Sequence, residues 1–143
     1  MYREYFTLPL SLESIVHQKE HSRCGLHQSL EQHLHLILTT AFSEFSMDEE
    51  FGCAIWEHEF DNLTSGSKLK ELIKQSLLSA IAAHEKRLIN LRIELLVRHE
   101  ELLDMERTRR VKKRIEISVS GKINITNEKF DYRDCFFIGP LSY

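Results

Sequence analysis

The sequence predicts an α+β fold in which two amphipathic helices pack on a three-stranded, mainly antiparallel sheet. Two segments with apolar residues at helical spacing come first, and three segments with alternating apolar residues follow them. Strands joined by short turns usually pair as antiparallel neighbours, and amphipathic helices need an apolar sheet face to cover. We therefore expect a meander of three strands with both helices on one face.

Two helices and a long loop are expected before the strands. The first helix should run from Leu26 to Phe42, because its apolar residues recur at intervals of three and four. The second should run from Ser67, a plausible N-cap, to about His84. The stretch between them has no sustained period and holds large aromatic side chains, so we interpret it as a loop that packs against its own core or a partner.

Three strands are expected in the second half of the chain. Alternation runs from Ile89 to Val97, and it returns from Ile115 to Ile125 with Gly121 as a candidate bulge or kink. A third strand is expected from Phe130 to Ile138. The charged segment from His99 to Arg110 leaves three alternatives open: a strand extension, a short helix or an exposed connection.

Length and composition predict one folded domain with an N-terminal arm. The chain has 143 residues, of which 42% are hydrophobic, and this is enough for one modest core. Residues 1–22 carry scattered apolar positions without a sustained period, which indicates an arm. We expect residues 23–143 to form a single α+β domain.

Charge and cysteine content argue against several classes of function. A formal net charge of −3 offers no basic face for nucleic acid, and the basic run 107–114 follows acidic residues and lacks interleaved aromatic rings. Three cysteines without CxxC spacing predict neither a disulfide framework nor a zinc site, so a reducing cytoplasm fits best. We expect no signal peptide and no direct membrane insertion, because no apolar run approaches the roughly 20 residues of a spanning helix.

Histidine spacing gives only a weak indication of metal binding. His17 and His21 are one helical turn apart, and His33 and His35 lie close together in the sequence. No third ligand follows at a recognisable interval, so solvated or hydrogen-bonded histidines are favoured over ligands. We expect no metal, no cofactor and no small-molecule ligand.

Three local motifs carry a resemblance to a known family. They are Ser29–Leu34 followed by Ile37–Thr40, the segment Asp48–Gly52, and the segment Ile81–Arg87. With the order of the elements, they resemble the TssE-like baseplate proteins of type VI secretion systems and the related tail-lysozyme-like wedge proteins of contractile phages. Glu85 and Arg87 match a Glu-Pro-Arg triplet of that family, whereas Lys86 departs from it and lacks the backbone restriction of proline.

The resemblance implies a structural role for a divergent member of this family. Such a subunit joins other baseplate wedge proteins and offers the first sheath ring of a contractile injection machine a docking template. Physically, this docking would use β-augmentation at an exposed strand edge. The resemblance also implies a cytoplasmic position, in a machine docked at the inner membrane.

Five residues are expected at a partner interface. The resemblance indicates Glu85, Arg87, Phe51 and Gly52, and the loop aromatic Trp56 is added because so large a side chain is expected to pack on something. The alternative for Glu85 and Arg87 is a local ion pair across the turn between helix and strand, which contributes little to stability if it is exposed.

A peptidoglycan-cleaving, lysozyme-like glycosidase is the alternative function, because relatives carry a lysozyme label. Glycoside cleavage needs two carboxylates facing a sugar cleft, and the candidates are Glu57, Glu59, Asp61 and Glu85. Nothing in their spacing pairs them, so we expect no catalytic residue and no enzyme.

Overall fold

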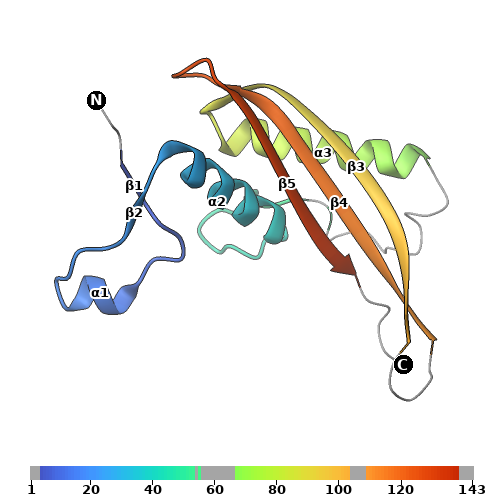
Figure 1. Cartoon of the computed structure of the whole chain (residues 1–143), viewed down its shortest axis with the longest axis horizontal. Helices are drawn as coiled ribbons and strands as arrows, with labels where there is room; N and C mark the ends of the chain where they lie inside the picture. Colours follow the sequence, from blue (N-terminus) through green and yellow to red (C-terminus); the bar gives the residue numbers. More distant parts are fainter. Residues whose placement is uncertain (1–3, 54, 56–66, 104–108, 139–143) are drawn as a thin grey trace.

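A computed structural model describes residues 4–53, 55, 67–103 and 109–138 of the chain (Figure 1). Within these residues the elements are, in order, β1 (Tyr5–Phe6), α1 (Leu12–Val16), β2 (Arg23–Cys24), α2 (Leu26–Thr39), α3 (Ser67–His84), β3 (Leu88–Leu103), β4 (Arg109–Ile123) and β5 (Lys129–Ile138). The predicted α+β class and the order of the elements from α2 to β5 are confirmed. No helix in these ranges is both long and apolar enough to cross a membrane.

The three long strands form one antiparallel sheet with β4 in the centre. Ile93 pairs with Val119, which pairs in turn with Tyr132 on the other side. The register of β3 against β4 shifts just after Ile89, opposite Gly121. A Cβ atom at Gly121 would lie 3.0 Å from the Ile89 carbonyl oxygen, so the close approach favours glycine. The predicted irregularity is present, but the extra residue belongs to β3.

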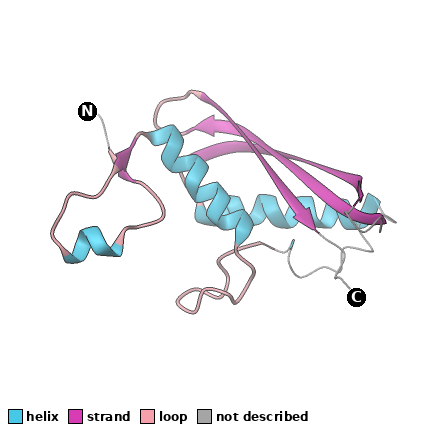
Figure 2. Ribbon diagram, turned by 60° about the horizontal axis from the view of Figure 1, so that its bottom comes forward, coloured by secondary structure: helices cyan, strands magenta, loops and turns pink. Residues whose placement is uncertain are grey.

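Both long helices cover the same face of the sheet (Figure 2), as the sequence predicts. Helix α3 lies along β3, and α2 contacts both α3 and β5. Their apolar stripes meet the inward residues of the strands, and this gives one continuous core. The largest fully buried side chains are Leu30, Leu34, Ile37, Leu38, Ile55, Ile73, Leu77, Ile81, Ile115, Ile117, Ile123 and Phe130.

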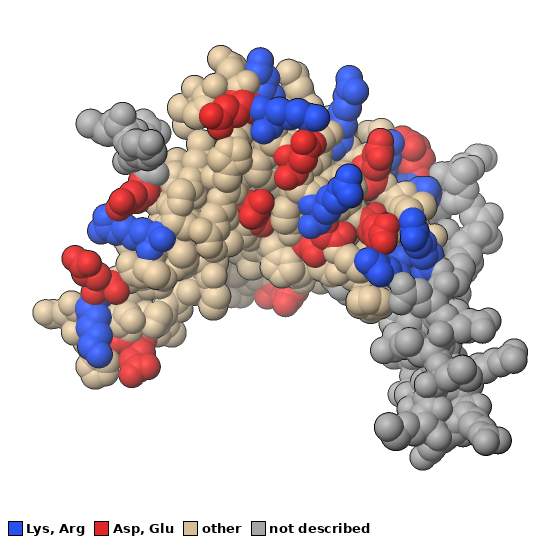
Figure 3. Space-filling model, in the orientation of Figure 1, with Lys and Arg blue, Asp and Glu red and all other residues tan. Residues whose placement is uncertain are grey.

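The opposite face of the sheet is polar. Figure 3 shows acidic and basic side chains interleaved on this side of the molecule. Arg98 and Glu116 lie 4.0 Å apart on neighbouring strands, and Lys129 and Asp131 lie 3.6 Å apart along β5. One apolar and one charged face is the usual arrangement of an antiparallel sheet that packs on one side only.

The N-terminal arm is more ordered than the sequence indicates. Tyr5 pairs with Cys24 and Phe6 with Arg23, so β1 and β2 form a second, two-stranded sheet beside α2 (Figure 1). Helix α1 is capped by Ser11, whose hydroxyl accepts a hydrogen bond from the Ser14 amide. The expectation of two helices and one sheet is therefore incomplete. Elements of two and five residues are too short to show a period.

Several element boundaries also differ from the prediction, and β4 ends at Ile123 rather than Ile125. Helix α2 ends at Thr39 rather than Phe42, because Thr40 is extended and its hydroxyl donates to the Leu36 carbonyl at 2.6 Å. In the segment from His99 to Arg110, β3 continues to Leu103 and β4 begins at Arg109, so the strand extension is the correct alternative at both ends; residues 104–108 lie outside the described residues.

Candidate functional site

The turn between α3 and β3 carries a buried ion pair. The main chain of Glu85 still bonds to the Ile81 carbonyl at 2.8 Å, and its side chain turns inward until only 2% of the residue is exposed. Nε of Arg87 donates to Oε1 and a terminal nitrogen to Oε2, both at 2.8 Å. The amide of Arg87 also donates to Oε1 at 3.1 Å. The carboxylate thus closes the turn and holds the guanidinium in a bidentate pair.

Helix α2 contributes two more partners to this pair. His33 Nδ1 lies 2.6 Å from Glu85 Oε2, and an ionised carboxylate can only accept, so this nitrogen donates. Arg87 donates a further hydrogen bond to the Ser29 hydroxyl at 3.0 Å. Ser29 and His33 are one helical turn apart and therefore share a face of α2. The four side chains, which we call the corner network, connect α2 to the α3–β3 turn.

The N-terminal arm reaches the corner network as well. The ring of Tyr5 in β1 lies under the Arg87 guanidinium, with 5.1 Å between the guanidinium carbon and the ring centroid. Leu8 of the arm donates its amide hydrogen to the Gln32 side chain at 3.0 Å. The arm is thus anchored beside the corner network by α2 and Arg87 together.

The network keeps both of its charges over the whole physiological pH range. Burial alone raises the pKa of Glu85, but hydrogen bonds from Arg87 and His33 outweigh this effect and lower that pKa from 4.5 to about 2. The hydrogen bond to Glu85 in turn raises the pKa of Arg87 above its usual value. A general acid for glycoside cleavage needs a raised pKa, so Glu85 is poorly suited to that chemistry. The other candidate carboxylates, Glu57, Glu59 and Asp61, lie outside the described residues.

Phe51 brings the loop after α2 to the corner network. Its ring stacks near His33 at a centroid separation of 6.2 Å and meets His84 edge-on at 5.0 Å. Gly52 follows at φ +127°, and a Cβ atom there would lie 2.5 Å from the Thr40 carbonyl oxygen. Gly52 thereby allows the loop to return to the end of α2 and fixes the place of Phe51.

The structure brings three of the five predicted interface residues together. Glu85 and Arg87 contact each other, and Phe51 joins them through His33. Gly52 acts through the backbone, and Trp56 lies outside the described residues. The sequence did not predict His33 as a member of this site, because a single histidine on an amphipathic helix gives no indication of its partner in the tertiary structure.

The remaining histidines of α2 have separate partners. His35 Nδ1 lies 2.6 Å from Asp134 on β5, and His27 Nε2 lies 3.0 Å from Glu128 after β4. Across the described ranges, no three His, Cys, Asp or Glu side chains gather as metal ligands would. The histidines of α2 therefore connect it to three different parts of the molecule.

The comparisons with known proteins agree with this architecture. The fold is similar to a crystal structure from Geobacter sulfurreducens of a protein proposed to be a tail lysozyme. The TM-score is 0.58 at 22% identity, over 83% of this chain and 96% of that one. A comparison with curated proteins found no match. The family model described as "Baseplate wedge protein gp25" matches residues 24–128, from β2 to the turn before β5 and including the corner network. The chain belongs to this baseplate wedge family.

Proposed function

We propose that this baseplate subunit serves a type VI secretion system or a related contractile injection machine, where it joins other wedge proteins and the first sheath ring. Family membership supports a structural role among baseplate proteins. The Glu85 and Arg87 match to the family triplet supports the same baseplate role. In such a machine the subunit would lie on the cytoplasmic side of the inner membrane.

The observation that carries the proposal is the way the corner network presents Arg87. Glu85 is almost fully buried, so it cannot contact a partner and instead orients the guanidinium. The Arg87 side chain keeps 23% of its surface exposed, and the half-buried ring of Phe51 reaches the same network through His33. Arginine and aromatic side chains are the types that most often dominate protein interfaces. Arg87 and Phe51 are therefore the proposed contacts, with Glu85 and Gly52 as positioning residues.

The sheet supplies the proposed docking template for the sheath. Among the described residues, β3 and β5 each have a neighbour on one side only within the sheet, so each leaves an edge of backbone donors and acceptors. A strand from a sheath subunit could extend the sheet at such an edge, with main-chain bonds for affinity and side chains for register.

A pull-down of the full-length tagged chain from its native cells, read by mass spectrometry, tests the proposal. We expect wedge, hub or sheath proteins to be recovered in stoichiometric amounts. Recovery of sugar-processing enzymes or nucleic acid alone would overturn the proposal. A peptidoglycan-release assay on the same preparation, with Glu85→Gln as the control, addresses the glycosidase alternative.

A further inference from the structure

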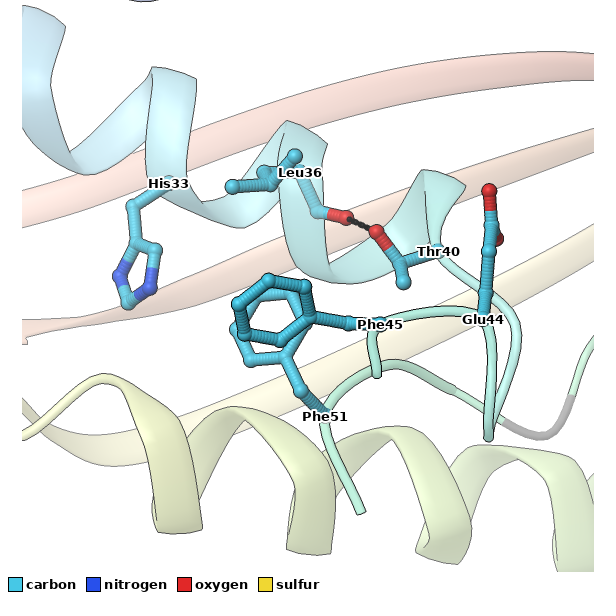
Figure 4. A pocket seen from close by; sticks show the side chains of 6 residues that line it. All are labelled: His33, Leu36, Thr40, Glu44, Phe45 and Phe51. Carbon is cyan, nitrogen blue, oxygen red and sulfur yellow. Dashed lines mark hydrogen bonds between the residues drawn. The ribbon is translucent and has the colours of Figure 1, made fainter. Parts of the chain in front are cut away.

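An open groove lies between the last turns of α2 and the loop that follows it. Its volume is about 440 Å³, and it is lined by His33, Leu36, Thr40, Glu44, Phe45 and Phe51. Figure 4 shows the two phenylalanine rings together below α2, with the His33 side chain extending downward on the same side of the helix. The Thr40 hydroxyl is engaged by the Leu36 carbonyl. The groove wall is therefore mainly apolar.

The apolar side chains of this groove are unusually exposed. Leu36 is 43% exposed and Phe45 is 48% exposed, and Met47, two residues after Phe45 in the same loop, reaches 84%. Phe45 contacts Phe51 edge-on at 6.2 Å, so the exposed ring is held in place by a neighbour that is itself packed on His84. A group of exposed apolar residues with a polar rim is typical of an interaction site.

The chain segment that forms most of the groove carries charged residues of one sign only. Between Cys24 and Ser67 the sequence has eight acidic residues and no lysine or arginine. Four of the acidic residues lie on the exposed loop that forms the groove, namely Glu44, Asp48, Glu49 and Glu50. All 19 lysines and arginines of the chain lie outside this segment. This acidic loop therefore favours a partner with positive charge.

The backbone around the groove is already paired, which determines how a partner can bind. The Ser43 amide donates to the Glu49 carbonyl at 2.9 Å, and the Cys53 amide donates to the Thr40 carbonyl at 3.0 Å. The Ala41 amide donates to the Glu44 carboxylate at 2.8 Å. The loop thus offers little main chain for an added strand. Recognition has to rest on side chains, as when an amphipathic helix fills a groove.

We propose that this groove receives an amphipathic helix of another wedge protein, with apolar residues one turn apart and flanking lysines or arginines. The apolar residues would cover Leu36, Phe45 and Phe51, and the basic residues would face the acidic loop. This inference rests on the proposed function and adds the chemistry of the partner. It assigns the groove, next to the corner network, to wedge assembly and leaves the sheet edges to the sheath.

Photocrosslinking tests the inference with the full chain in its native cells. A benzophenone side chain replaces Phe45 in one preparation and Leu72, which is 64% exposed on α3, in the control. We expect position 45 to crosslink a basic, helical segment of a wedge protein and position 72 to give no such product. Crosslinks to an acidic or extended segment, to a second copy of this chain, or equally from both positions would overturn the inference.

Two variants separate this inference from the proposed function. Phe45→Ser should lower the recovered wedge partner by about tenfold, as expected for an interface anchor, while Leu72→Ser should not. Asp48→Lys combined with Glu49→Lys should also lower recovery, by an amount that shrinks at high salt. Unchanged recovery in both groove variants would refute the groove and leave the baseplate role standing. If the unaltered chain recovers no wedge protein, the proposed function itself fails.

Discussion

Replacing Glu85 with glutamine removes the charge from the corner network while keeping nearly the same shape. The drop in the pKa of Glu85 from 4.5 to about 2 measures how much the folded protein favours the ionised carboxylate. A shift of this size corresponds to about 3 kcal/mol of stability at neutral pH. We therefore expect Glu85→Gln to lower the free energy of unfolding by about 3 kcal/mol at pH 7.

The pH dependence of this loss has a definite sign. The pKa of Glu85 is lower in the folded protein than in the unfolded chain, so the unfolded chain takes up a proton first as the pH falls. The stabilisation is complete above about pH 5 and disappears as the pH falls through 4.5 toward 2. At pH 3 the difference between the unaltered chain and Glu85→Gln should have shrunk to about half of its value at pH 7.

Urea unfolding of both proteins at pH 7, 5 and 3 measures these differences directly. Glu128→Gln is the matched control, because Glu128 also pairs with a histidine at 3.0 Å but is 59% exposed. The control should change stability by less than about 1 kcal/mol. The role of the corner network would be refuted if Glu85→Gln lowered the free energy of unfolding at pH 7 by no more than the control does. It would also be refuted if the loss did not vary between pH 7 and 3.

Three further predictions concern the loop, the core and the arm. Gly52→Ala should lower the free energy of unfolding by about 1–3 kcal/mol, because the added Cβ would meet the Thr40 carbonyl oxygen and alanine would be strained at this positive φ. An unchanged melting temperature would contradict the position of the loop. Leu34→Ala, at a fully buried position, should lower the free energy of unfolding by about 2–5 kcal/mol in denaturant titrations, whereas Leu36→Ala in the open groove should lower it far less. Equal losses would count against the assigned faces of α2. Deletion of residues 1–22 should affect assembly more than folding: recovery of wedge partners should fall, while the shortened chain still melts as a folded domain. A shortened chain that no longer folds would disprove this prediction.

Sequence periodicity predicted the elements that are long and one-sided. The apolar stripe of α3 and the alternation in β3 and β5 are strong because each element buries one face and exposes the other. The same reasoning missed β1, α1 and β2, because they are two to five residues long. The two strands are held by pairing with each other and by the contact of β1 with α2, rather than by a buried stripe of their own.

Lys86 shows how the structure settles a local question that the sequence raised. The missing proline removes a backbone restriction from the turn between α3 and β3. The bond from the Arg87 amide to the Glu85 carboxylate holds this turn instead, together with the bond from the Glu85 amide to Ile81. Lys86 itself remains exposed. A side chain thus supplies the restraint that the backbone lacks.

The sequence by itself determined the α+β class, the order of the main elements and the residues at the α3–β3 turn. These follow from local spacing and from a short motif. Only the tertiary structure decided that Glu85 is buried, that His33 and Ser29 complete its network and that Phe51 lies against it. These residues are far apart in the chain, and the packing of α2 against α3 is what places them within hydrogen-bonding and ring-contact distance of one another.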